Sequence, residues 1–171
     1  MSYTARRSIA AAIALLVAAC GGAAQPRALE ELELAELETY GCGYGFWLGT
    51  PEQDVAIRLG VADHEAVASG ELAREATLPD EAWQATVQHG RDLFANWCDD
   101  VLEPGEPTPD VTEEWPITGG TITLEGGAVD QGCPGELSAT LADLEVTAPD
   151  DTTIDLGSAE VTNDTWGCFA G

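Results

Sequence analysis

The feature that most constrains the fold is a series of short segments in which apolar and polar residues alternate. Residues 55–61, 83–88 and 136–163 show this period of two, and residues 43–48 and 121–124 are rich in aromatic or β-branched side chains. Alternation buries one face of a strand and exposes the other. Glycine, proline and aspartate separate the segments, and no long helical period occurs. The sequence therefore predicts an all-β fold, a single β-sandwich of immunoglobulin-like or related type.

Two connecting segments are less regular. Residues 62–76 have some helical propensity, but Gly70 interrupts them, so we expect a loop with an edge strand. Residues 103–110 contain three prolines and predict the clearest loop, which we expect to cross between the two sheets. We expect the strand over 121–124 to begin after Gly119 and Gly120.

The N-terminus has the pattern of a secretory signal. Arg6 and Arg7 precede a short apolar run over residues 8–19, which ends in Leu16-Val17-Ala18-Ala19-Cys20. The run is too short to span a bilayer, which needs about 20 apolar residues. Small residues leading into a cysteine resemble the lipobox of bacterial lipoproteins. The resemblance implies cleavage before Cys20, lipidation of that cysteine, and export to the outer side of a membrane with the lipid as anchor.

This reading divides the chain into three parts. Residues 1–19 are a lipoprotein signal peptide, residues 20–39 a lipidated N-terminus with an acidic tether, and residues 40–171 the β-sandwich domain. Residues 29–38 carry five glutamates among leucines. Their spacing fits either an acidic stalk or a short first strand.

The charge of the chain limits its partners. The formal net charge is −25, and removal of Arg6 and Arg7 with the signal would make it −27. Nucleic acids and anionic lipid surfaces would be repelled, so we expect no nucleic-acid partner. Cations, basic proteins and saline surroundings remain compatible with this charge. An acidic, lysine-free surface is also typical of proteins that stay soluble at high salt.

Four cysteines follow Cys20 and predict two disulfides in an exported domain. We expect the pairs Cys42–Cys98 and Cys133–Cys168. A hairpin turn at residues 149–151 would set Val146 opposite Ile154 and Leu144 opposite Leu156. That register brings Cys133 opposite Gly167, one residue from Cys168, and a bulge would close the gap.

Clustered carboxylates are the best metal candidates in the sequence. Asp99 and Asp100 follow Cys98, and Asp150, Asp151 and Asp155 cluster near the last hairpin turn. Calcium takes six to eight oxygen ligands. Neither cluster fits the EF-hand spacing. No cofactor is therefore expected except, at most, Ca²⁺ at these residues.

Histidines and tryptophans are the remaining candidates for chemistry. His64 and His89 are the only histidines, and no serine or cysteine stands in a nucleophile motif. Tryptophans can form platforms for sugars or peptides, but in a small sandwich most of them fill the core or pack on disulfides. The five tryptophans are Trp47, Trp83, Trp97, Trp115 and Trp166.

These observations predict a cell-surface lipoprotein that acts as a non-catalytic binding or structural module of the envelope. An envelope protein or a glycan is the expected partner. Two alternatives stay open: a calcium-dependent adhesion or substrate-binding module, and an envelope hydrolase that uses His64 or His89.

Overall fold

The computed structural model describes residues 29–99, 101–130, 132–133 and 135–169, and it confirms that the fold is nearly all-β. Eight strands form one antiparallel sheet. The strands are β1 (Glu38–Gly41), β2 (Gly45–Gly49), β3 (Val55–Val61), β4 (Glu75–Thr77), β5 (Trp83–Arg91), β6 (Asp110–Gly126), β7 (Gly135–Thr147) and β8 (Thr153–Trp166). Among the described residues, no helix has the length and apolar character needed to cross a membrane.

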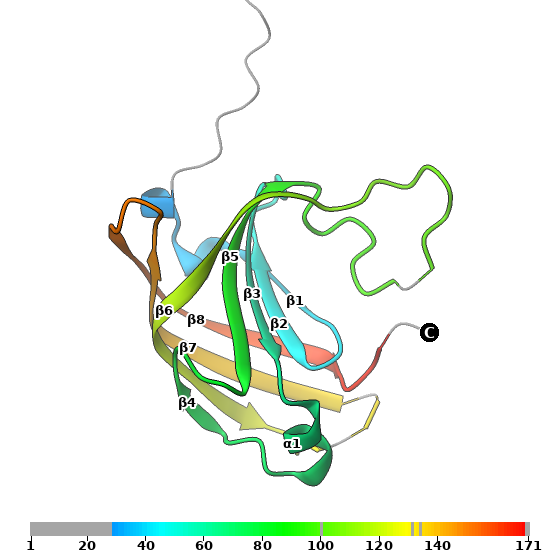
Figure 1. The fold of residues 1–171 in the computed structure, drawn as a ribbon. Helices are drawn as coiled ribbons and strands as arrows, with labels where there is room; N and C mark the ends of the chain where they lie inside the picture. Colours follow the sequence, from blue (N-terminus) through cyan, green and yellow to red (C-terminus); the bar gives the residue numbers. More distant parts are fainter. Residues whose placement is uncertain (1–28, 100, 131, 134, 170–171) are drawn as a thin grey trace, which may run out of the picture.

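The sheet curls on itself, so that two halves pack face to face (Figure 1). The front half-sheet consists of β1, β2, β3, β5 and the first part of β6. The back half-sheet consists of β4, the rest of β6, β7 and β8, and its strands cross those of the front half-sheet steeply. The strands follow one another in chain order except for β4. This meander replaces the Greek-key order of immunoglobulin domains.

Strand β6 turns the corner between the two halves at Gly119 and Gly120. The pairing of β6 with β7 shifts register on both sides of Gly119, and Gly120 has φ 106°. Bulges and glycines of this kind bend a strand without ending it. The predicted strand over 121–124 is present as part of β6, but its expected start after the glycine pair was wrong, because β6 continues through both glycines.

A single backbone bridge between Gly43 and Trp166, together with side-chain hydrogen bonds, closes the sheet between β8 and the β1–β2 turn. The buried Asn163 donates from Nδ2 to the carbonyl oxygens of Gly43 at 3.2 Å and Gly45 at 2.8 Å. Thr165 donates from Oγ1 to the carbonyl of Gly41. A Cβ on Gly41 would lie only 2.3 Å from Asn163 Cγ, so this close approach requires glycine.

The core lies between the two half-sheets and follows the alternation seen in the sequence. Phe46 of β2 and Trp166 of β8 are fully buried and meet with ring centroids 5.5 Å apart. Trp166 also donates from Nε1 to the carbonyl of Val129, which satisfies its polar group inside the core. Trp83 lies in the same core, so packing is the confirmed role of these two tryptophans.

The hairpin of β7 and β8 confirms the predicted disulfide pairing. Val146 pairs with Ile154 as expected, whereas Leu144 pairs with Gly157 instead of Leu156 because bulges intervene. A further register shift after Gly135 sets Gly135 opposite Trp166. Two residues beyond this pair lie the two cysteines, and the bonds Cys133–Cys168 and Cys42–Cys98 are both present, with Cα–Cα distances of 4.5 and 5.7 Å.

The acidic N-terminal segment packs on the domain, which corrects the expected boundary at residue 40. Two 3-10 turns, η1 (Leu29–Glu31) and η2 (Leu34–Glu36), precede β1. The leucines of this segment are buried in the main core, namely Leu29, Leu32, Leu34 and Leu37. Burial of these apolar side chains holds the segment against the domain, although its glutamates alone suggested a stalk. Residues 1–28, with the signal, Cys20 and the start of the tether, lie outside the described residues.

Two loops also differ from expectation. Residues 64–69 form the helix α1 (His64–Ser69), in which Asp63 caps the N-terminus and Gly70 ends the helix in the left-handed conformation. Gly70 therefore acts as a C-cap, not an interruption, and the short strand β4 follows. The segment 103–110 does not cross between sheets, because residues 103–109 belong to the connection of residues 92–109 between the paired strands β5 and β6, and Asp110 begins β6.

Candidate functional site

The outer face of the front half-sheet carries a row of three side chains from three strands. The register sets Trp47 of β2 opposite Arg58 of β3, and Arg58 opposite Thr86 of β5. All three point away from the core, because their neighbours on each strand, such as Ile57 and Val87, are the fully buried residues of the inner face. We call Trp47, Arg58 and Thr86 the outer-face row.

Arg58 is the cation of this row. Its Cζ atom lies 5.0 Å from the ring centroid of Trp47, which is a cation–π contact. Within the described part of the chain its guanidinium has no ion pair and no hydrogen bond. The other two described arginines are engaged: Arg74 donates to backbone carbonyls of Leu124 and Gly127, and Arg91 pairs with Asp110.

Thr86 adds a buried hydroxyl to the row. The residue is 8% exposed, and its Oγ1 has no hydrogen-bond partner among the described residues. A buried hydroxyl without a partner costs about 1–3 kcal/mol. Beside it on β5, Gln88 donates from Nε2 to the carboxylate of Glu114 on β6. The row is therefore flanked by an amide–carboxylate pair, while its own hydroxyl is left unsatisfied.

An aromatic cluster borders the row where the loop of residues 92–109 begins. Trp97 meets Trp47 edge-on with centroids 4.2 Å apart, and Phe94 packs between Tyr40 and Trp97. Phe94 fits because the facing residue of β2 is Gly49, where a Cβ would lie 2.1 Å from the phenyl ring. The Cys42–Cys98 disulfide holds the same end of the loop to the sheet. Trp97 packs in this aromatic cluster, next in sequence to Cys98 of the disulfide.

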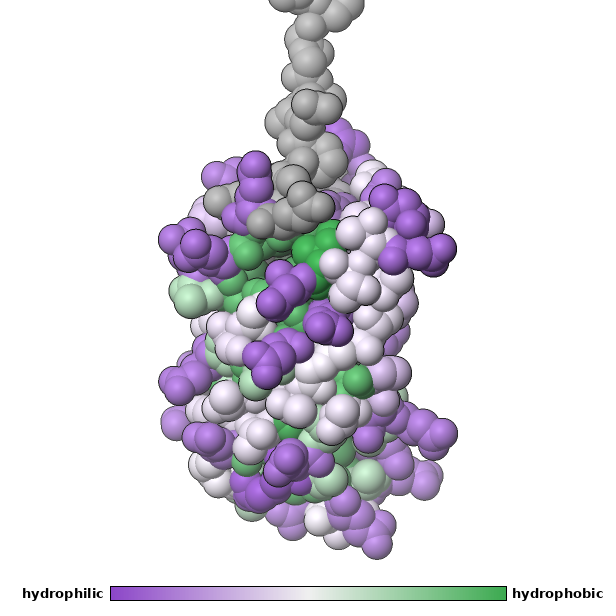
Figure 2. All heavy atoms as spheres, turned by 90° about the vertical axis from the view of Figure 1, so that its left-hand side faces the viewer, coloured by the Kyte–Doolittle hydropathy of each residue, from purple (hydrophilic) through white to green (hydrophobic). Residues whose placement is uncertain are grey.

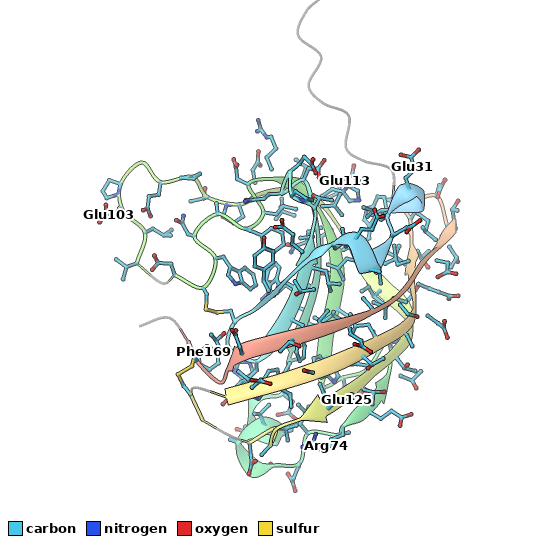
Figure 3. The ribbon with its side chains drawn as sticks, turned by 180° about the vertical axis from the view of Figure 1, so that it is seen from behind. Glu31, Arg74, Glu103, Glu113, Glu125 and Phe169 are labelled. Atoms are coloured by element: carbon cyan, nitrogen blue, oxygen red, sulfur yellow. A yellow bond between two sulfur atoms is a disulfide. The ribbon has the colours of Figure 1, made fainter. Side chains whose placement is uncertain are left out.

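Beyond Cys98 the loop projects away from both half-sheets. Figure 3 shows Glu103 at its far end, well separated from the strands. Val101 and Leu102 are 64% and 54% exposed, which is high for apolar side chains. Asn96 donates from Nδ2 to the carbonyl of Pro107 and so ties the two arms of the loop together.

The carboxylates predicted as calcium ligands lie in two separate loops, as the sequence separates them. Asp99 lies in the projecting loop, where its Oδ1 accepts from the backbone N–H of Val101. Asp150, Asp151 and Asp155 lie at the opposite side of the domain, in and beside the β7–β8 turn (Figure 1). Asp100 lies outside the described residues.

The aspartates of the β7–β8 turn stabilise the backbone conformation of the turn. Asp150 Oδ1 accepts from the N–H of Thr152, and this bond lowers the pKa of Asp150. Asp155 Oδ1 accepts from the N–H of Gly157, and Asp151 holds a positive φ of 66°. These are the usual roles of aspartate in turns. Among the described residues, no group of three or more metal-ligating side chains gathers.

The two histidines lie at opposite ends of β3. His89 pairs with Val55, whereas His64 starts the helix that follows Val61. Six strand residues separate these points, or about 20 Å at 3.3 Å per residue. Burial beside Trp115 lowers the pKa of His89, against the weaker opposing effect of Glu113 and Asp54, and its Nε2 is unpartnered in the described structure. The structure thus gives the histidines no shared cleft.

A shallow groove of about 260 Å³ lies on another side of the domain, between η2 and β8. It is lined by Leu32, Glu33, Leu34 and Ala35 from the N-terminal segment and by residues 155–158. Figure 2 looks onto this side and shows hydrophobic surface among hydrophilic side chains. The groove contains none of the buried polar atoms that lack a hydrogen-bond partner in the described structure.

Comparisons with known proteins add no relative to this description, since no family model, no curated protein and no solved structure matches the chain. The candidate site therefore stands on its own residues. Sequence reasoning named Trp47 and Trp97 only together with the other three tryptophans, with packing as the preferred role, and it missed Arg58 and Thr86. Both residues occupy the polar positions of alternating strands, and only the pairing of β2, β3 and β5 brings them beside Trp47.

Proposed function

We infer that the chain is an exported lipoprotein whose β domain is a non-catalytic binding module at the cell surface. The observation that carries this inference is the outer-face row, in which the guanidinium of Arg58 lies over the indole of Trp47 and has no ion pair or hydrogen bond within the described residues. Aromatic side chains with a few placed polar groups beside them are the usual lining of ligand sites.

The lipobox-like residues support the anchoring part of the proposal. Nine peptide units separate Cys20 from Leu29, where the described domain begins, and they span at most about 30 Å. A lipid at Cys20 would therefore keep the domain close to the membrane surface. An envelope glycan or an envelope protein remains the expected kind of partner.

The alternatives gain no support from the described structure. Hydrolysis would need a histidine near a nucleophile or metal-ligating group, and His64 and His89 lie far apart. Calcium binding would need several carboxylates at one of the two loops, whereas no group of three or more possible metal ligands gathers among the described residues, and Asp150 and Asp155 accept from backbone N–H groups.

A thermal-shift screen tests the binding function. The mature chain from Gly21 onward, exported so that both disulfides form, is screened against soluble oligosaccharides and against peptides. This chain contains the whole described core. A ligand at 100 times its Kd stabilises the folded state by about 2.7 kcal/mol. We expect at least one ligand to raise the Tm of the native chain and not that of Trp47→Ala.

The control in this screen is Trp115→Phe, a change at a half-buried tryptophan on the inner side of β6, which should keep the ligand response. If every ligand acts equally on Trp47→Ala, or none acts on the native chain, the outer face is not a binding site. Anchoring is tested separately with the full chain. Cys20→Ala should abolish incorporation of radiolabelled palmitate and release the protein from membranes.

A further inference from the structure

The first part of strand β6 has a free edge. Residues 110–116 pair with β5 on one side, whereas β6 pairs with β7 only from Ile117 onward. Within the described part of the chain, no strand pairs with the other side of residues 110–116, and Figure 1 shows this stretch at the margin of the front half-sheet. Its residues are exposed apart from the half-buried Trp115. We call residues 110–116 the open edge, because such an edge offers backbone donors and acceptors to a further strand.

The register shows which backbone groups point to the open edge. Hydrogen bonds extend the β3–β5 ladder at both ends, from the N–H of Gly90 to the C=O of Asp54 and from the N–H of Ala62 to the C=O of Ala82. Hydrogen-bonded residues alternate along an antiparallel pair, so the even-numbered residues of β5 bond to β3 and the odd-numbered ones to β6. Glu114 lies opposite the even-numbered Gln88. The N–H and C=O of Glu114 are therefore directed to the open edge.

Pro116 agrees with this assignment. It lies opposite Thr86, which is also even-numbered, so the N–H that proline lacks would have pointed to the open edge and not to β5. The ladder between β5 and β6 thus loses no hydrogen bond at this position. The C=O of Pro116 is still directed outward. A strand that docks on the open edge can therefore make two backbone hydrogen bonds with Glu114 and one with Pro116.

The charges of the open edge indicate which strand would dock there. Glu113 and Glu114 are exposed, and the Glu114 carboxylate accepts only from the neutral amide of Gln88 among the described residues. A second copy of the chain would bring the same carboxylates and a net charge of −25, so two open edges would repel each other. A lysine or arginine placed opposite Glu114 would instead be attracted.

We propose that the open edge binds an extended segment of a protein partner, rich in lysine or arginine, by strand addition. The segment lies antiparallel to β6, as the paired strands of the sheet do. A basic residue lies opposite Glu114, bonds to its N–H and C=O, and sets its own side chain beside the Glu114 carboxylate. Alternate residues of the segment are apolar and point to the other face of the sheet. The proposal goes beyond the proposed function, because it concerns another surface and does not depend on the outer-face row.

The experiment is isothermal titration calorimetry of the mature chain with the end-blocked hexapeptide Lys-Val-Lys-Val-Lys-Val. The buffer contains about 0.15 M NaCl, so that attraction between distant charges is screened. We expect the peptide to bind with a Kd below about 1 mM. The matched acidic peptide Glu-Val-Glu-Val-Glu-Val should bind at least about tenfold more weakly, because its side chains face like charges.

Methylation of the peptide backbone tests the hydrogen bonds on the native protein. If lysine lies opposite Glu114, the lysine N–H groups face β6 and the valine N–H groups face solvent. Methylating the three lysine N–H groups should therefore raise the Kd at least about tenfold, since each methyl removes a donor that the edge carbonyls need. Methylating the three valine N–H groups should change the Kd less than about threefold, because these groups make no bond to the protein.

Variants of Glu114 separate the backbone contribution from the charge. Glu114→Pro removes the N–H that points to the open edge and keeps the ladder with β5, so the Kd should rise at least about tenfold. Glu114→Gln removes only the charge and should raise the Kd less than about fivefold, because exposed ion pairs contribute little. Glu103→Gln makes the same charge change at the far end of the projecting loop and should alter the Kd less than about twofold. Urea unfolding checks that each variant is folded.

Each alternative result overturns a stated part of the proposal. If no basic peptide binds with a Kd below about 1 mM, the open edge is not a docking site. If the lysine-methylated and valine-methylated peptides bind equally well, the attraction is one of charge alone and strand addition is wrong. If valine methylation has the larger effect, the basic residue does not lie opposite Glu114. None of these results concerns Trp47, so the proposed function can stand when this proposal fails.

Discussion

Replacing Asn163 tests how the curled sheet is held closed. The side chain is fully buried and joins β8 to the turn between β1 and β2. In Asn163→Ala the carbonyls of Gly43 and Gly45 lose a donor, and the N–H of Thr165 loses its acceptor Oδ1. At about 1 kcal/mol for each backbone group left without this partner, the free energy of unfolding should fall by about 3 kcal/mol. That is a large part of the 5–15 kcal/mol typical of such a domain.

The assay is urea unfolding of the mature chain with both disulfides intact, where the midpoint should fall and the slope should stay constant. Thr162→Ala, at the exposed neighbouring position on β8, should cost about 0.5 kcal/mol or less. The isosteric Asn163→Asp adds a pH test. Its buried carboxylate would face two carbonyl oxygens, so its pKa in the folded state would be raised.

An acid whose pKa is raised by folding destabilises the protein as the pH rises above the unfolded value of about 3.9. Relative to the native chain, Asn163→Asp should therefore be more destabilised at pH 7 than at pH 4. A loss of less than 1 kcal/mol for Asn163→Ala, or an Asp variant whose loss does not depend on pH, would refute the role given to Asn163.

Three further predictions concern the Cys42–Cys98 disulfide, the buried His89 and the net negative charge of the chain. Replacing Cys42 and Cys98 together by serine should cost about 4 kcal/mol by loop entropy, measured by urea unfolding, and a loss near zero would mean that the loop base is held by packing alone. Because burial lowers the pKa of His89, the unfolded chain binds more protons below about pH 6.5, and stability should fall as the pH drops from 7.5 to 5.5 with a slope of at most about 1.4 kcal/mol per pH unit. His89→Gln should remove this slope and His64→Gln should keep it; the reverse pattern would place the titration at His64. With a net charge of −25, the Tm should rise with NaCl and level off towards 1 M, and a flat profile would show that self-repulsion does not limit stability.

Much of the fold follows from local patterns in the sequence. The alternation over 55–61 and 83–88 predicted β3 and β5, because successive side chains of a strand point to opposite faces and one face is buried. The hairpin turn near Pro149 fixed the register of β7 and β8 closely enough to pair Cys133 with Cys168. A disulfide could be predicted here because the register of two paired strands determines which of their residues lie close together in space.

The predictions that were wrong have a common physical cause: glycine and glutamate each occur in several kinds of local structure. From the sequence, Gly70 was interpreted as an interruption, but it is the C-cap of a helix. Gly119 and Gly120 were interpreted as a strand boundary, but they bend β6. The glutamates of residues 29–38 suggested a stalk, although the leucines between them are buried. In each case tertiary contacts determine which local structure the residue adopts, and these contacts cannot be recognised in the local sequence.

The candidate site was the least predictable part. Trp47, Arg58 and Thr86 are separated by at least eleven residues and meet only through the pairing of three strands. No spacing motif marks such a row. What identifies it is the combination of a guanidinium and a hydroxyl that both lack partners within the described residues, which requires coordinates.

The most direct test of the central claim is a nuclear magnetic resonance titration that follows the five tryptophan indole N–H signals of the mature chain. Each signal is assigned with a single Trp→Phe variant, and the ligand is the best-binding compound of the thermal-shift screen. If the outer face of the front half-sheet is the binding site, the Trp47 and Trp97 signals shift and saturate, while those of the core residues Trp83 and Trp166 stay in place. Unchanged Trp47 and Trp97 signals at saturating ligand would contradict the claim.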